Sequence, residues 1–156
     1  MDHKKDRFYI AYGSNLNLMQ MERRCPTAEV IGKTALKDWR LRFRGGRLSA
    51  VATVEKAKGC KVPVLVWKLQ PEDEHALDRY EGWPHLYRKE TLRVAVNGKR
   101  VYAMIYIMNE SGNPYGTPSK HYLNTILEGY KTAGFDTAPL IEAAKNIPVK
   151  EEMTNE

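Results

Sequence analysis

The chain has only two cysteines among its 156 residues, and no apolar run approaches the roughly 20 residues that a membrane-spanning helix needs. Cys25 and Cys60 lie far apart and form no Cys-x-x-Cys pair, so we interpret them as reduced thiols. The charged segment 1–6 lacks the apolar middle part of a secretion signal. These absences argue against a membrane partner and a disulfide-stabilised secreted fold, and they predict a cytoplasmic protein.

The sequence also lacks the residue patterns of the common cofactor sites. Its four histidines have no spacing typical of a zinc site: His3, His75, His85 and His121. There is no Gly-x-x-x-x-Gly-Lys-Ser/Thr loop, no Gly-x-Gly-x-x-Gly segment after the first predicted strand, no Gly-x-Ser-x-Gly elbow and no His-Glu-x-x-His pair. We therefore expect no metal and no cofactor, and nucleotide-binding, nicotinamide-dependent and serine-hydrolase functions lose most of their support.

Negative charge is in the minority, because the formal net charge is +6. Such a charge suggests an anionic partner, either a nucleic acid or a small acidic metabolite. The densest basic segment is residues 40–47, where alternation places Leu41 and Phe43 on one strand face and the arginines on the other. We interpret the arginines as a solvated strand face rather than an RNA-binding stripe, and expect no nucleic-acid partner.

The hydrophobic pattern predicts strands at residues 7–12, 29–36, 39–44, 50–55, 63–69, 87–96 and 100–108. It predicts helices at residues 18–24, from Pro71 to about Gly82, from about Tyr122 to a break at Gly134, and at about residues 138–147. Asn97-Gly98 between two strands is the strongest hairpin signal.

Strands and helices do not alternate, so the expected fold class is α+β. Six or seven strands would close, or nearly close, into a small mixed, mostly antiparallel β-barrel with helices packed outside. At this length we expect a single domain over residues 1–156, with a core at about 7–148 and two polar tails.

The segment Tyr12-Gly13-Ser14-Asn15-Leu16 directly follows the apolar run 8–11 and predicts a loop behind a strand. Gly13 allows backbone angles closed to other residues, so several N–H groups can point at one spot. Such a loop can hold an anion or a polarised carbonyl. The alternative is that Ser14 and Asn15 merely cap the following helix.

Glu81 lies at a helix end between Tyr80 and Gly82 and is followed by Trp83-Pro84. Partial burial among such neighbours would raise its pKa from about 4.3 toward neutrality, where a general acid or base is most useful. The alternative is an exposed glutamate at the C-terminal end of its helix, where its charge is mildly unfavourable.

Together these motifs resemble the γ-glutamylcyclotransferase-like family, which includes AIG2-like proteins and γ-glutamylamine cyclotransferases. The resemblance covers about residues 8–147. The motifs that carry it are Tyr12-Gly13-Ser14-Asn15-Leu16, Val64-Leu65-Val66-Trp67-Lys68-Leu69, Leu77-Asp78-Arg79-Tyr80-Glu81-Gly82 followed by Tyr87, and Thr117-Pro118-Ser119-Lys120-His121-Tyr122 before a helix ending in Ala133-Gly134. Trp83-Pro84-His85 departs from the mammalian glutathione-cycle enzyme and is nearer the bacterial and AIG2-like branches.

The resemblance implies a barrel-like mixed fold and a pocket for a small-molecule γ-glutamyl substrate. It implies that Glu81 is the catalytic acid and base. The substrate-binding positions that it implies are Tyr9, Ile10, Ala11, Tyr12, Gly13, Ser14, Asn15, Leu16, Tyr87 and Tyr122. The implied enzyme needs no cofactor. The sequence itself does not distinguish a monomer from a homodimer.

In the implied reaction the substrate's α-amine attacks its own γ-carbonyl, which releases 5-oxoproline and expels an amine or amino acid. No base follows Ser14 in a known arrangement, so it is not expected to be a nucleophile. Two rival functions stay open: a binding module that keeps the pocket without turnover, and a basic nucleic-acid-binding protein.

Overall fold

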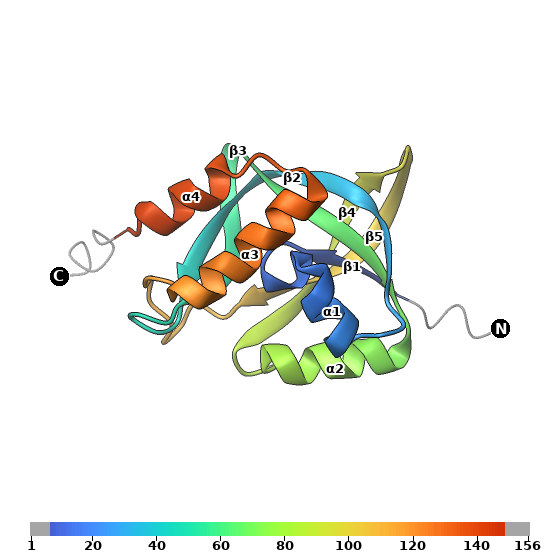
Figure 1. Cartoon of the computed structure of the whole chain (residues 1–156), viewed down its shortest axis with the longest axis horizontal. Helices are drawn as coiled ribbons and strands as arrows, with labels where there is room; N and C mark the ends of the chain where they lie inside the picture. Colours follow the sequence, from blue (N-terminus) through green and yellow to red (C-terminus); the bar gives the residue numbers. More distant parts are fainter. Residues whose placement is uncertain (1–6, 149–156) are drawn as a thin grey trace.

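The computed structural model describes residues 7–148, so the predicted polar tails lie outside the described residues. Its strands are β1 (Arg7–Ala11), β2 (Glu29–Arg44), β3 (Val51–Leu69), β4 (Tyr87–Val96) and β5 (Lys99–Met108). Its helices are the short η2 (Ser14–Leu16), α1 (Leu18–Arg24), α2 (Pro71–Glu81), α3 (Lys120–Ala133) and α4 (Ala138–Lys145) (Figure 1). The four predicted α-helices are confirmed within two residues or so at their ends.

The strands form one mixed sheet in the order β2-β3-β1-β5-β4. β1 lies at its centre and runs antiparallel to β3 but parallel to β5, where Tyr9 pairs with Met104. The predicted α+β class with a mostly antiparallel sheet is therefore confirmed. The central place of β1 carries the segment after Ala11 straight into the middle of the molecule.

The sequence predicts more strands than the fold contains, because predicted pairs merge. Residues 29–36 and 39–44 join in β2 across Asp38, which has a φ of 68° at an irregularity in the pairing. Residues 50–55 and 63–69 join in β3, where the N–H of Gly59 donates to Oδ1 of Asp38 at 2.9 Å. The expected breaks are thus irregularities within two long, paired strands.

The two edge strands of the sheet approach each other at one end. Asn97 and Gly98 have φ values of 52° and 77° at the tip of the β4–β5 hairpin, as the Asn-Gly signal predicts. The Asn97 side chain donates to the carbonyl of Ile31 in β2 at 2.8 Å. Within residues 7–148 the strand ladder nevertheless ends at β2 and β4, so the sheet is a curled, incompletely closed barrel.

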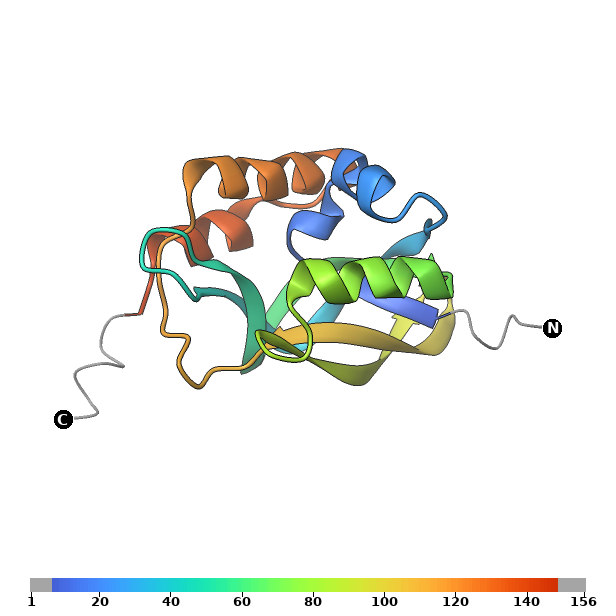
Figure 2. The same ribbon diagram turned by 90° about the horizontal axis from the view of Figure 1, so that it is seen from below.

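Helices cover the sheet from one side, where α1, α3 and α4 lie together in Figure 2. Helix α2 begins with Pro71 and ends at Gly82, whose φ of 69° gives the left-handed cap that stops a helix. Ion pairs hold α2 to the strands: Glu74 contacts Arg7 of β1 at 3.0 Å and Lys89 of β4 at 2.6 Å. These contacts anchor the first turn of α2 to the sheet.

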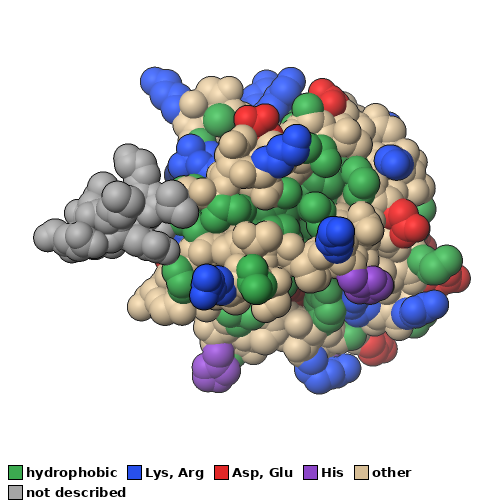
Figure 3. Space-filling model, turned by 60° about the vertical axis from the view of Figure 1, so that its left-hand side comes forward, with side chains coloured by type: hydrophobic (Ala, Val, Ile, Leu, Met, Phe, Trp, Pro, Cys, Tyr) green, Lys and Arg blue, Asp and Glu red, His purple; other side chains and the backbone are tan. Residues whose placement is uncertain are grey.

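The predicted solvated arginine face is wrong in part. Arg40, Arg42 and Arg44 do project from one face of β2, but all three lie within 3.3 to 3.6 Å of the Glu55 carboxylate in β3. The Tyr115 hydroxyl donates to the same carboxylate at 2.9 Å, and Arg44 is buried. On the face drawn in Figure 3, Lys and Arg side chains surround an area of hydrophobic side chains.

Candidate active site

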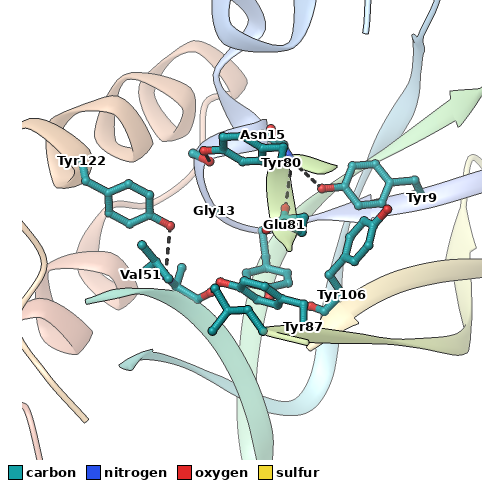
Figure 4. A pocket seen from close by; sticks show the side chains of 13 residues that line it. Tyr9, Gly13, Asn15, Val51, Tyr80, Glu81, Tyr87, Tyr106 and Tyr122 are labelled. Carbon is teal, nitrogen blue, oxygen red and sulfur yellow. Dashed lines mark hydrogen bonds between the residues drawn. The ribbon is translucent and has the colours of Figure 1, made fainter. Parts of the chain in front are cut away.

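A pocket of about 240 Å³ lies where the segment after β1 meets the end of α2 (Figure 4). Residues of β3, β4, β5 and α3 complete its wall. Six of the lining side chains are tyrosines, and Glu81 is the carboxylate among them. The two sequence motifs, distant along the chain, are therefore parts of one cavity.

Most of the predicted binding residues line this pocket, but three do not. The lining contains these predicted positions: Tyr9, Tyr12, Gly13, Ser14, Asn15, Glu81, Tyr87 and Tyr122. Ile10, Ala11 and Leu16 are fully buried in the hydrophobic core and do not line it. These three side chains support the strand and the loop from behind.

The loop after β1 presents backbone donors to the pocket. Leu16 and Asn17 donate their N–H groups back to the carbonyls of Gly13 and Ser14. In the described part of the chain, the N–H groups of Ser14 and Asn15 have no protein acceptor. The helix cap is instead Asn17, whose side chain accepts from the N–H of Gln20 at 3.1 Å. Ser14 and Asn15 are therefore not the caps of α1.

Glu81 is the last residue of α2, and its side chain faces the pocket rather than open solvent (Figure 4). Its Oε2 lies 3.4 Å from Nδ2 of Asn15. Burial raises the pKa of the carboxyl from 4.5 to about 8, and the charge of Arg24 partly opposes this rise. Glu81 is therefore not an exposed glutamate at the end of its helix, which was the alternative interpretation of the sequence.

Three tyrosine hydroxyls are fixed by backbone groups around the pocket. Tyr12 donates to the carbonyl of Tyr106 at 2.6 Å, and Tyr87 donates to the carbonyl of Ala52 at 2.5 Å. Tyr122 accepts from the N–H of Ala52 at 2.9 Å, which leaves its own proton free to donate. Burial raises the pKa of all three phenols, so they stay neutral near pH 7.

Sequence reasoning missed several lining residues: Val51, Ala52, Tyr80, Leu86 and Tyr106. Tyr80 carried a signal, since it directly precedes Glu81 in the motif. The others occupy strand or loop positions with no distinguishing residue type. Only the pairing of the strands brings them to the pocket.

The described residues contain no group of three or more His, Cys, Asp or Glu side chains that could hold a metal ion. Cys25 and Cys60 are both free thiols. None of the helices within residues 7–148 combines the length and the apolar character needed to span a membrane.

The sequence matches the profile of one known protein family and is similar to named proteins. The profile of the family described as "Gamma-glutamyl cyclotransferase, AIG2-like" matches residues 9–124, which include Glu81 and Tyr122. The human protein named "Gamma-glutamylcyclotransferase" is 32% identical over 136 residues, covering 81% of this chain and 71% of that protein.

Two solved structures resemble the whole fold. An uncharacterized protein from Homo sapiens superposes with a TM-score of 0.79 at 28% identity, covering 97% of each chain. A structure named "Gamma-glutamyl cyclotransferase" superposes with a TM-score of 0.79 at 26% identity, covering 96% of each chain. The likeness thus extends over nearly the whole length of both chains.

Proposed function

The chain belongs to the gamma-glutamyl cyclotransferase, AIG2-like family, and we propose that it releases 5-oxoproline from a γ-glutamyl amino acid or γ-glutamyl-amine, with Glu81 as general acid and base. The observation that carries this proposal is the place of Glu81. It is a partly buried carboxylate in a pocket whose lining also contains Ser14 and Asn15, two residues whose backbone N–H groups have no protein acceptor within residues 7–148. A pKa of about 8 suits a group that must both take and give a proton near neutrality.

The reaction needs only the substrate and a proton carrier. A bond forms between the substrate's α-nitrogen and its γ-carbon, and the bond from that carbon to the departing nitrogen breaks. Glu81 takes the proton that the α-ammonium loses and delivers a proton to the departing nitrogen. Because nucleophile and electrophile share one molecule, a correctly folded substrate can reach effective molarities of about 10⁵ M or more.

The loop supplies the complementary half of the site. The free N–H groups of Ser14 and Asn15 hold either the substrate's α-carboxylate or the oxyanion that develops on the γ-carbonyl. An oxyanion donor contributes about 3 kcal/mol to the transition state. Tyr122 adds a hydroxyl proton from the opposite wall. The Ser14 hydroxyl shares its hydrogen bond with Tyr80, not with a base, which supports a binding role over a nucleophilic one.

The wider assignment is part of the same proposal. Residues 7–148 act as one domain, supported by the single sheet and shared core, as a monomer or homodimer. A cytoplasmic location is supported by the two free thiols. The convergence of three arginines on Glu55 supports a small-molecule partner over a nucleic acid, because this basic face is partly neutralised within the protein.

One assay tests the function against its rivals. The protein is incubated with a panel of γ-glutamyl amino acids, γ-glutamyl-amines and glutathione, and 5-oxoproline is measured. Glu81→Gln should lower the rate by about 10²–10⁴-fold with the fold retained by circular dichroism. Glu72→Gln is the matched control, since Glu72 is exposed at the other end of α2. Full activity in Glu81→Gln would contradict the role of Glu81, and ligand binding without any turnover in the natural protein would favour the binding module.

A further inference from the structure

Arg24 is the last residue of α1 and lies behind the pocket wall rather than in its lining. Its guanidinium donates to Oε1 of Gln20 at 2.7 Å and to Oδ1 of Asn15. The same group stacks over the Tyr80 ring, with its carbon 3.5 Å from the ring centroid. Arg24 therefore contacts both sequence motifs of the pocket at once.

The bond from Arg24 determines which way the Asn15 amide faces. Because Oδ1 of Asn15 accepts from the guanidinium, Nδ2 faces the Tyr9 hydroxyl at 2.8 Å and Oε2 of Glu81 at 3.4 Å (Figure 4). The reversed amide would point its NH₂ at the guanidinium, where donor faces donor, and its oxygen at Glu81, where it would be repelled by the charged carboxylate. Asn15 is 3% exposed, so solvent cannot compensate for the wrong orientation.

We propose that Arg24 is the positioning residue of Glu81: by orienting the Asn15 amide and stacking on Tyr80, it holds the carboxylate toward the pocket. The catalytic meaning of this role rests on the function proposed above. Arg24 itself touches no reacting atom. Its effect reaches the substrate only through Asn15, Tyr80 and Glu81.

The other titratable groups that line the pocket around Glu81 do not supply a positive charge in place of the Arg24 guanidinium. They are phenols that line the pocket: Tyr9 of β1, Tyr12 directly after β1, Tyr80 of α2, Tyr87 of β4, Tyr106 of β5 and Tyr122 of α3. Burial has the largest effect on five of them, and the charge of Glu81 further raises the pKa of Tyr9, Tyr12, Tyr87, Tyr106 and Tyr122. Asp78, one turn earlier on α2, accepts from Tyr106 and pairs with Lys89. Arg24 is the cation that lowers the pKa of the Glu81 carboxyl.

Two substitutions separate the charge of Arg24 from its geometry. Arg24→Met removes both, so the acid limb of the kcat/KM pH profile should move up by about one pH unit, and kcat/KM at pH 7 should fall about tenfold. Arg24→Lys keeps the charge but cannot donate in a plane to Asn15 while stacking on Tyr80. Its acid limb should stay near that of the natural protein while kcat falls.

Arg7→Gln is the matched control. Arg7 of β1 also donates to a group on α2, because it makes two 3.0 Å bonds to Glu74. Glu74 lies two turns before Glu81, and neither Arg7 nor Glu74 lines the pocket. This variant should lose some stability without a moved pH profile. A profile in Arg24→Met that coincides with that of Arg7→Gln would overturn the positioning role.

A measurement without substrate keeps this inference separate from the proposed function. The Glu81 carboxyl is titrated by NMR in protein with ¹³C-labelled glutamate, and its resonance is assigned by its loss in Glu81→Gln. The pKa should rise by about one unit in Arg24→Met and stay unchanged in Arg7→Gln. A rise in a protein that releases no 5-oxoproline would support the positioning of Glu81 and refute the proposed reaction. An unchanged pKa in an active enzyme would refute the positioning alone.

Discussion

The hydroxyl groups of Ser14 and Tyr80 lie 2.9 Å apart and join the loop after β1 to the last turn of α2 at the pocket wall. The Tyr80 ring also carries the Arg24 guanidinium on its face. The loop that offers backbone donors and the helix end that offers the carboxylate are therefore held at a fixed spacing. A substrate must reach both at once, so this spacing matters for binding.

Tyr80→Phe should raise KM for γ-glutamyl substrates by about two- to tenfold, because it removes one hydrogen bond worth roughly 0.5–1.5 kcal/mol and keeps the ring under Arg24. Steady-state kinetics at constant pH measure this change. The matched control is Tyr102→Phe, since Tyr102 is an exposed tyrosine of β5 outside the pocket. Equal KM values in the two variants would show that the Ser14 contact does not order the loop.

The proton on Glu81 links stability to pH. Burial raises the pKa of this carboxyl to about 8 in the folded protein, from 4.5 in the unfolded chain. The native state thus holds the proton more tightly, so protonation stabilises the fold. This contribution is complete below about pH 4.5 and is lost as the pH rises through about 8.

Urea unfolding at about pH 5, pH 7 and pH 9 should therefore show a free energy of unfolding that falls with pH in the natural protein and falls less in Glu81→Gln. The slope due to this one group cannot exceed about 1.4 kcal/mol per pH unit. Glu72→Gln should behave as the natural protein does, because Glu72 is exposed. Parallel curves for the natural protein and Glu81→Gln would mean that Glu81 titrates alike in the folded and unfolded states.

Local chemistry explains which parts of the site could be predicted from the sequence. Gly13 and the residues after it predict a loop because their backbone preferences are local. The aromatic and small neighbours of Glu81 indicate that this carboxylate is partly buried. The residue that caps α1 cannot be identified from local preferences in the same way. Ser14, Asn15 and Asn17 all have suitable side chains, and only the fold shows that Asn17 is the cap.

Long-range pairing explains the rest. The three arginines of β2 look solvated in the sequence because their common partner, Glu55, faces them only through the β2–β3 register. Asp38 and Gly59 look like strand ends, yet their hydrogen bond lets both strands continue. Arg24 carried no signal at all, since its contact with Asn15 joins the two ends of a loop-and-helix segment only after folding.

Gly13 marks a close approach within the pocket, and this gives a further prediction. A Cβ there would lie 3.1 Å from the Cβ of Ala52 and 3.7 Å from the Tyr122 hydroxyl oxygen, both part of the lining. The branches of a valine would occupy space needed by the ligand. Gly13→Val should therefore raise KM by about tenfold or more, while the free energy of unfolding falls by only about 1–3 kcal/mol.

Gly32→Val is the control that separates binding from packing in that prediction. A Cβ at Gly32 would be more crowded, at 2.8 Å from both Cγ2 of Val96 and Oδ1 of Asn97, but it lies between the edge strands and outside the pocket. This variant should lose at least as much stability as Gly13→Val and keep KM unchanged. If KM instead follows stability in both variants, the glycine of the first loop serves the packing of β3, and the loop's role as a cradle for the γ-glutamyl group fails.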